Sequence, residues 1–292
     1  MVTSAVASSV QIRHATPKDS EICGTIFYEA FTTINSSHNF PPEVTALEEG
    51  VGILGMLFSH PGFYCVVAEY EGRIVGSNCM DERSAICGIG PVSVDPDFQN
   101  RGIGRALMAA MLDRVQQKGS MGVRLLQAAF HNRSLSLYSK LGFDVREPMS
   151  VMQRQPSNVA VEGCAVRPAN MDDLDVCNRL CERVHGHNRA GELRDGINQG
   201  TALVVERHYR ISGYASGFGY FGHAVAETNL DLQALIGSAT NVSGPGIIVP
   251  TRNVELFRWC LSHGFRVFQP MSLMTIGLYN EPAGAYLPSV LY

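Results

Sequence analysis

A short glycine-containing segment, QNRGIG at 99–104, has the residues best suited to hold an anion. Gly102 and Gly104 lack a Cβ, so the main chain can approach a ligand closely there. An apolar-periodic segment follows at once and predicts a helix, whose first turn has free N–H groups and a partial positive charge. Arg101 and Arg105 would add attraction for a phosphate. The segment has the composition of a diphosphate cradle, although an ordinary strand-to-helix turn can carry the same glycines.

The spacing of this segment differs from two common phosphate-binding loops. A dinucleotide-binding loop reads G-x-G-x-x-G, and no third glycine stands at that place. A Walker A loop needs G-K-S or G-K-T after its glycines, and neither occurs here. The loop instead reads Gln-x-x-Gly-x-Gly. A second polar motif, NRSLSLYSKLGF at 132–143, follows the next predicted strand.

The first half of the chain predicts a mixed sheet with helices on it. The order of expected elements is β-α-α-β-β-β-α-β-α-β, which places the chain in the mixed α/β (α+β) class. Apolar alternation and turn residues predict strands at 10–15, 85–94, 122–130 and 143–153, and a hairpin over 63–80 that turns at Glu71–Gly72. Apolar periodicity and caps predict helices from Thr16 to 31, over 44–59, from 103 to Gly119 and over 132–142.

The chain repeats itself. GFDVREPMSVM at 142–152 and GFRVFQPMSLM at 264–274 are identical at seven of eleven positions. IRHATPKDSEIC at 12–23 matches VRPANMDDLDVC at 166–177, and the matches keep their order along the chain. Such self-similarity indicates an internal duplication.

The duplication divides the chain into two predicted domains. They comprise residues 1–153 and 164–292, and the polar stretch at about 154–163 is the predicted linker. In the second copy, no Gln-x-x-Gly-x-Gly occurs between Gly213 and Gly264. The second copy is therefore expected to keep the framework without the anion cradle.

Two motifs, VSVDPDFQNRGIGRAL at 92–107 and NRSLSLYSKLGF at 132–143, together resemble the GCN5-related N-acetyltransferase (GNAT) superfamily. The resemblance covers Val10 to about Gln153, and the repeat suggests a second such fold. The chain thus looks like a tandem form with a degenerate C-terminal copy. This implies two GNAT-like domains, each with a mixed, mostly antiparallel sheet flanked by helices.

The resemblance also implies a cosubstrate and the residues that bind it. In this family the Gln-x-x-Gly-x-Gly loop binds the pyrophosphate of acetyl-coenzyme A through main-chain N–H groups. The strand before the loop pairs with the pantetheine arm, and the asparagine of the later motif often contacts the cofactor. The implied cofactor-binding residues are Val92, Val94, Gln99, Asn100, Arg101, Gly102, Ile103, Gly104, Arg105 and Asn132. No metal is expected.

Tyr138 matches a family tyrosine that often lies near the sulfur. A neutral amine would attack the thioester carbonyl directly, and a strand N–H at or near Val94 would stabilise the oxyanion. Tyr138 would protonate the leaving thiolate. The alternative is a core aromatic, because Leu135, Tyr138 and Leu141 share one helix face. The sequence leaves the general base open among Glu29, His38, Asp81, Glu82, His131 and a chain of waters.

We expect an acetyl-coenzyme A-dependent N-acetyltransferase that acts on a primary amine of a small molecule, with the reaction in the first copy. The segment at 33–44 lies where the family shapes its acceptor site, and it has no acidic cluster to indicate a polycationic substrate. Cys260 stands where the repeat aligns Tyr138, so the second copy is expected to bind no coenzyme A. A coenzyme A-responsive regulator without turnover, and a protein or peptide N-acetyltransferase, stay open as alternatives.

Composition narrows the expected partners. The net charge of −4 provides no basic field, so nucleic acid is not favoured. The N-terminus lacks a signal-peptide pattern, and no run of about 18 apolar residues predicts a membrane span, so the cytoplasm is expected. A homodimer stays open.

The eight cysteines lie mostly in apolar stretches, which is typical of reduced, buried thiols. Cys177, Cys181 and His185 recur every four residues. This spacing fits the buried face of an amphipathic helix. A metal site would need further ligands at zinc-type spacing, which are absent from the sequence around them.

Overall fold

The computed structural model describes residues 10–155 and 159–291. The first copy contains β1 (Val10–His14), the 3-10 turn η1 (Pro17–Asp19), α1 (Ser20–Ser37), α2 (Leu47–Ser59), β2 (Phe63–Tyr70), β3 (Arg73–Asp81), β4 (Ile86–Ile89), β5 (Ser93–Val94), η2 (Pro96–Phe98), α3 (Ile103–Lys118), β6 (Gly122–Ala128), α4 (Asn132–Lys140) and β7 (Asp144–Gln153). The second contains β8 (Ala165–Pro168), η3 (Met171–Asp173), α5 (Leu174–His185), α6 (Ala190–Gln199), β9 (Leu203–Arg207), β10 (Arg210–Ala215), β11 (Ala224–Ala226), α7 (Asn229–Gly237), β12 (Ile247–Pro250), α8 (Val254–Ser262), β13 (Arg266–Gly277) and β14 (Ala285–Leu287). Residues 156–158 of the predicted linker lie outside the described residues. So do residues 1–9, to which the expectation of no signal peptide applies.

The two copies share the order β-α-α-β-β-β-α-β-α-β, apart from β5 and η2 in the first copy and β14 in the second, and they share the same ion pairs. Arg13 in β1 donates to Asp19 at 2.9 Å, just before α1, and to Glu69 in β2 at 2.7 Å. An aspartate three residues after the N-cap closes the capping box in both copies. The equivalent groups in the second copy are Arg167, Asp173 and Glu206, joined at 2.8 Å in both pairs. The conserved geometry confirms the duplication.

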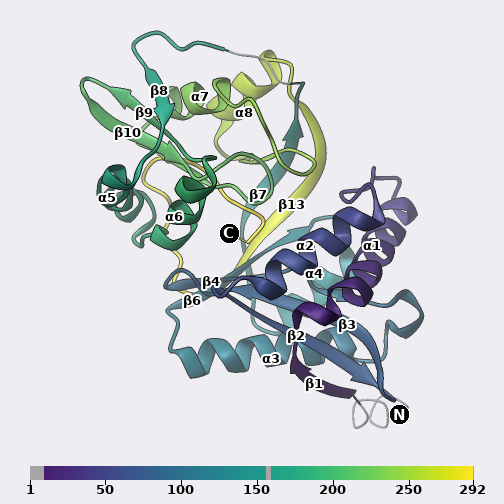
Figure 1. Cartoon of the computed structure of the whole chain (residues 1–292). Coiled ribbons are helices and arrows are strands. Elements are labelled where there is room, and N and C mark those ends of the chain that lie inside the picture. The colour runs from purple at the N-terminus through teal and green to yellow at the C-terminus, as the bar shows by residue number, and fades with distance from the viewer. Residues whose placement is uncertain (1–9, 156–158, 292) are drawn as a thin grey trace.

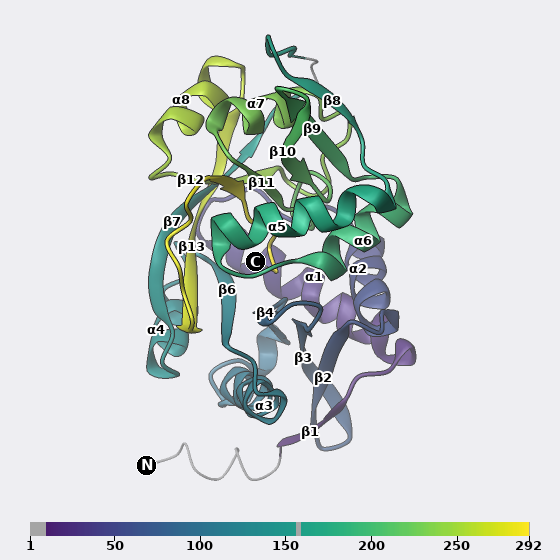
Figure 2. The same ribbon diagram turned by 90° about the vertical axis from the view of Figure 1, so that its left-hand side faces the viewer.

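The final strands of the two copies are exchanged. The first sheet has the order β1-β2-β3-β4-β6-β13-β7-β12, with β5 paired to β3, and the second has the order β14-β11-β10-β9-β8. Strand β13 of the second copy therefore lies between β6 and β7 of the first, and β7 in turn pairs with β12. Figures 1 and 2 show β7 and β13 running side by side from one half of the molecule to the other. The domains predicted at 1–153 and 164–292 stay a prediction, and the larger sheet contains strands from both of them.

Two predicted elements need correction. The strand predicted at 85–94 is two strands: β4 pairs in parallel with β6, whereas β5 pairs antiparallel with β3. Pro91, which has no N–H for a ladder, stands between them. The helix predicted to end at 31 continues to Ser37, because Phe27, Phe31 and Ile34 extend its apolar face. The connection to α2 is correspondingly shorter than the predicted 33–44.

Most other elements lie where the periodicity places them. The hairpin turns at Glu71–Gly72, and both residues have positive φ, as a two-residue β-hairpin requires. Cys177 and Cys181 are fully buried on α5 among apolar neighbours, which confirms that they lie on the buried face of this helix. None of the helices in the described ranges combines the length and the apolar character needed to cross a bilayer.

Candidate active site

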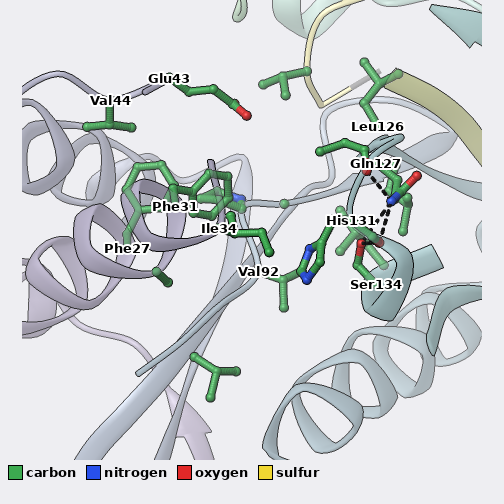
Figure 3. Close-up of a pocket in the computed structure, with 18 of the residues that line it drawn as sticks. Phe27, Phe31, Ile34, Glu43, Val44, Val92, Leu126, Gln127, His131 and Ser134 are labelled. Carbon is green, nitrogen blue, oxygen red and sulfur yellow. Dashed lines mark hydrogen bonds between the residues drawn. The ribbon is translucent and has the colours of Figure 1, made fainter. Parts of the chain in front are cut away.

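A cavity of about 780 Å³ lies between the two copies. Helices α1 and α2 form one wall, the start of α3 closes one end, and the β6–α4 connection faces α1 across the space (Figure 3). The second copy also contributes to the lining, through Tyr220, Phe221, Ser243, Gly244, Pro245, Met271, Val290 and Leu291. The predicted glycine loop thus lies at a cavity that residues of both copies line.

The glycine loop has the conformation of a cradle. Gly102 is the N-cap of α3 and has φ of +84°, a left-handed value that favours glycine. A Cβ at this position would meet no atom within 4 Å, and at Gly104 the nearest atoms would be 3.7 Å and 3.8 Å away. The main chain therefore faces open space with its free N–H groups, and a diphosphate there would accept charge-assisted hydrogen bonds.

Two arginines add positive charge at this end of the cavity. Arg105, in the first turn of α3, lines it. Arg133 in α4 also lines it and donates to Gln99 Oε1 at 2.9 Å and to Asn100 Oδ1 at 3.3 Å, so it fixes the loop to α4. Sequence reasoning missed Arg133, although it directly follows Asn132 in the second motif.

The gap between β4 and β5 exposes a strand edge. The N–H of Asp95 donates to the Val75 carbonyl at 2.9 Å. Because hydrogen-bonding directions alternate along a strand, the main-chain groups of Val92 and Val94 point away from β3. No strand among the described residues pairs with that edge of β5. An extended ligand could form main-chain hydrogen bonds with this edge, as a neighbouring strand would.

Eight of the ten predicted cofactor-binding residues line the cavity: Val92, Val94, Gln99, Asn100, Gly102, Ile103, Gly104 and Arg105. Arg101 instead donates to the Asp97 carbonyl at 3.3 Å and stacks on Phe98, with its guanidinium 5.0 Å from the ring centre. Asn132 is exposed at the start of α4 and is not part of the lining. Cofactor contact by these ten residues stays a prediction.

Tyr138 lies on α4 where the cavity meets the core. It lines the cavity and packs on the first copy's core, with its ring centre 6.1 Å from that of Phe143. Burial raises the pKa of Tyr138 to about 12, so the hydroxyl keeps its proton at neutral pH. This position agrees with both hypotheses for Tyr138, namely that it donates a proton and that it is a core aromatic residue.

Most of the sequence's candidates for a base lie elsewhere. Glu29 is exposed. Asp81 accepts from Arg83 at 2.9 Å, and Glu82 accepts from Arg114 at 2.8 Å; neither lines the cavity. His38 is likewise outside the lining, and its ring centre lies 5.4 Å from that of Phe130.

His131, at the N-cap of α4, does line the cavity. Its Nε2 is buried and has no hydrogen-bond partner within the described part of the chain. Burial, followed by the charges of Arg133 and His38, lowers the pKa of His131 to about 4. The imidazole is therefore neutral at pH 7.

Sequence reasoning missed Glu43, which also lines the cavity. Its carboxylate accepts a hydrogen bond of 2.7 Å from Gln269 in the second copy. Burial raises the pKa of Glu43, although hydrogen bonds from Gln269, Tyr220 and Asn35 oppose this. The available signal was a lone acidic residue after two prolines, in the segment at 33–44 that was expected to shape the acceptor site.

The second copy has a different group at the position of the glycine loop. Helix α7 corresponds to α3, and its N-cap Thr228 accepts from the N–H of Asp231. Asp231, the third residue of α7, is fully buried and is held by Arg207 at 2.7 Å. The third residue of α3 is Arg105, so the charge at this position is reversed. A carboxylate at this helix start repels a phosphate.

Residues 61–145 match the family model described as an acetyltransferase (GNAT) domain. This segment of the chain is a GNAT domain. The matched range includes the split strands, the glycine loop and Tyr138. The mycothiol acetyltransferase of Kocuria rhizophila is 33% identical over 104 residues, which cover 33% of this chain and 34% of that protein. The chain spans about a third to two fifths of the length of curated relatives such as this one.

The GNAT fold extends over both copies. A protein from Pyrococcus horikoshii, provisionally assigned as an acetyltransferase, superposes with a TM-score of 0.72 at 21% identity, covering 95% of this chain and 94% of that chain. A tandem GNAT protein from the clavulanic acid biosynthesis pathway superposes with a TM-score of 0.54 at 13% identity, covering 92% of this chain and 98% of that chain. At these identities the likeness concerns the fold, and it confirms the predicted tandem architecture.

Proposed function

We propose that the first copy transfers an acetyl group from acetyl-coenzyme A to a primary amine of a small molecule. The observation that carries this proposal is the glycine loop at the start of α3, which opens into a cavity that Tyr138 also lines. The family match supports the acetyl transfer. Residues of the second copy line part of this cavity, and this favours a small acceptor over an extended chain.

The loop and the strand edge would hold the cosubstrate together. Main-chain N–H groups at 102–105 would bind the diphosphate, and Arg105 would contribute charge. Arg133 would keep Gln99 and Asn100 in place through its two hydrogen bonds. The outward main-chain groups of Val92 and Val94 would bind the pantetheine arm as a neighbouring strand would.

Two groups of the chain would then act on the reacting atoms. A new C–N bond forms as the acceptor amine attacks, and the C–S bond breaks. An N–H of β5, at or near Val94, would stabilise the charge that develops on the carbonyl oxygen. Tyr138 would give its proton to the departing thiolate, and its high pKa keeps that proton available.

The second copy would bind no coenzyme A. Asp231 occupies the helix start at which a diphosphate would bind and is already paired with Arg207. Cys260, which aligns with Tyr138, is fully buried in the second copy's core. The second copy would instead close the acceptor end of the first.

A thiol-release assay with a panel of amines tests the proposal. The panel contains amino acids, polyamines, arylalkylamines, aminoglycosides and a peptide with a free N-terminus. Turnover with at least one small amine is the expected result. Acetylation of the peptide alone would indicate a protein acetyltransferase, and tight acetyl-coenzyme A binding without turnover would indicate a regulator; each outcome overturns the proposal.

A further inference from the structure

The charged residues that line the cavity are divided between its two ends. Arg105 and Arg133 lie at the glycine loop, whereas Glu43 and Glu49 lie beside α1 and α2. Glu49 is engaged locally, since its Oε2 accepts from the N–H of Thr45 at 2.8 Å and from its hydroxyl at 3.0 Å. Figure 3 shows the Glu43 carboxylate directed into the cavity. Glu43 is therefore the acid directed toward a ligand at the end away from the loop, although its carboxylate also accepts hydrogen bonds from Gln269, Tyr220 and Asn35.

Residues of the second copy hold Glu43 in this position. Gln269 in β13 is fully buried, and its Nε2 donates to Glu43 Oε1 at 2.7 Å and to the Tyr220 hydroxyl at 2.9 Å. Both hydrogen bonds are donated by the side-chain amide nitrogen of Gln269. They also connect the acidic end of the cavity to the strand exchanged between the copies.

Acceptor atoms near Glu43 lack donors. The Oε1 of Gln269 and the Oδ1 of Asn35 are buried without a hydrogen-bond partner in the described residues. Asn35 lines the cavity and is 1% exposed, and its Nδ2 already donates to the Pro41 carbonyl at 3.2 Å. A buried acceptor left unpaired is costly, so Asn35, which lines the cavity, favours a ligand that brings an N–H donor. An ammonium group has three donors and a charge opposite to that of Glu43.

The rest of this end is apolar. Apolar and aromatic side chains of α1, of the turn before α2 and of the second copy line the cavity together with Glu43: Phe27, Phe31, Ile34, Val44, Tyr220 and Phe221. A hydrocarbon or aromatic body would be buried favourably against them. A second cationic group would have no further counter-charge at this end except the engaged Glu49.

We infer that Glu43 binds the ammonium of an acceptor with a single primary amine on an apolar body, and that Gln269 of the second copy positions it. This inference rests on the proposed function and names its acceptor class. Glu43 takes one proton from the ammonium and thereby frees the lone pair that forms the C–N bond; the proton later leaves to solvent. Glu43 is then a catalytic residue, and Gln269 is a positioning residue.

The test compares 2-phenylethylamine with spermidine in the thiol-release assay. We expect 2-phenylethylamine to be the better substrate of the wild-type chain, and Glu43→Gln to lower its kcat/KM about 100-fold. The KM for acetyl-coenzyme A should stay within about twofold. Glu48→Gln, a change at an exposed position on α2, is the matched control and should leave both values unchanged. Activity of Glu43→Gln at the wild-type level, or a preference for spermidine, overturns the inference.

Gln269→Leu tests the positioning role. It should lower kcat/KM for the amine about tenfold while leaving the KM for acetyl-coenzyme A unchanged, because only the acceptor end loses a contact. Equal losses for both substrates would indicate a merely structural role and contradict the assignment.

Direct binding separates this inference from the proposed function. Calorimetry should show that the wild-type chain binds 2-phenylethylamine more tightly than 2-phenylethanol, and that Glu43→Gln removes the difference. Such binding without any turnover would contradict the proposed function and support the ammonium site. Turnover that does not depend on Glu43 would support the proposed function and contradict the ammonium site. If Glu43→Gln does not fold, the wild-type comparison of amine with alcohol decides, and equal binding overturns the inference.

Discussion

Leu125 in β6 lies directly opposite Met274 in β13, and both side chains are buried in the core of the first copy. The two residues come from different copies of the duplicated fold. The sheet that carries the glycine loop is therefore completed by a strand of the copy that lacks this loop. Strand β7 pairs with β13 and β12 on the far side. The two copies are consequently expected to fold as one unit.

Deletion of residues 164–292 should prevent the first copy from folding. The deletion removes Met274 from the core and leaves β6 and β7 without the strand between them, which exposes apolar surface and two strand edges. The fragment should show no cooperative urea transition by circular dichroism. As a control, a full-length chain cleaved within 154–163 should elute from a sizing column as one particle. A fragment with a sharp transition would contradict the expectation.

The double variant Gly102→Asp, Gly104→Asp should abolish acetyl-coenzyme A binding. A side chain at Gly102 is strained at φ of +84°, and two carboxylates at the start of α3 repel a diphosphate. Calorimetry should show binding weakened by about 100-fold or more, since several charge-assisted hydrogen bonds are lost.

The matched control is Leu230→Asp, which adds a carboxylate at the exposed second position of α7. It should leave acetyl-coenzyme A binding unchanged, because that helix start already carries Asp231. Tight binding at one site per chain in the double variant would show that the second copy is competent.

The sequence predicted the local features of this protein better than its long-range pairings. Caps and periodicity correctly predicted the N-cap at Thr16, the hairpin turn at Glu71–Gly72 and the helix after Gly102. Each of these features depends on neighbours within a few residues. The strand exchange was not predictable in this way. The segments at 142–152 and 264–274 are so alike that either satisfies the apolar pattern beside β6.

Glu43 escaped prediction for a similar reason. Its proposed role depends on Gln269, which lies far along the chain in β13, and no local sequence pattern joins the two residues. The split at Pro91 was visible as a residue without an N–H, but the apolar run on both sides predicted one continuous strand. Motifs thus identified the glycine-loop end of the cavity, whereas the end at Glu43 is formed only by the packing of the two copies.

Tyr138→Phe should lower kcat about 100-fold if the hydroxyl protonates the thiolate. Acetyl-coenzyme A binding should stay unchanged, because the ring remains in place. Since the pKa of Tyr138 is raised to about 12, loss of its proton should not reduce kcat anywhere between pH 7 and about 10. Tyr209→Phe, at a fully exposed position, is the control. A wild-type kcat for Tyr138→Phe would identify this residue as a core aromatic.

Buried histidines should make the fold sensitive to mild acid. The pKa values of His131 and His187 are lowered to about 4 by burial, whereas an unfolded histidine titrates near 6.5. Below about pH 6.5 the unfolded chain therefore binds more protons, and the free energy of unfolding should fall until about pH 4. The pKa of Asp19 is lowered to about 2, so protonation of its carboxylate reduces the free energy of unfolding further only below about pH 3.8.

Urea unfolding at pH 7, 5.5 and 4.5 measures this dependence. His131→Asn should reduce the proton uptake on unfolding near pH 5 by about one, and the variant should lose less stability between pH 7 and 4.5 than the wild-type chain. His208→Asn, at an exposed turn position, should leave the slope as it is. The same slope in His131→Asn as in the wild-type chain would mean that His131 titrates alike in the folded and unfolded states. Its unpartnered Nε2 would then be open to solvent protons rather than enclosed in the cavity wall.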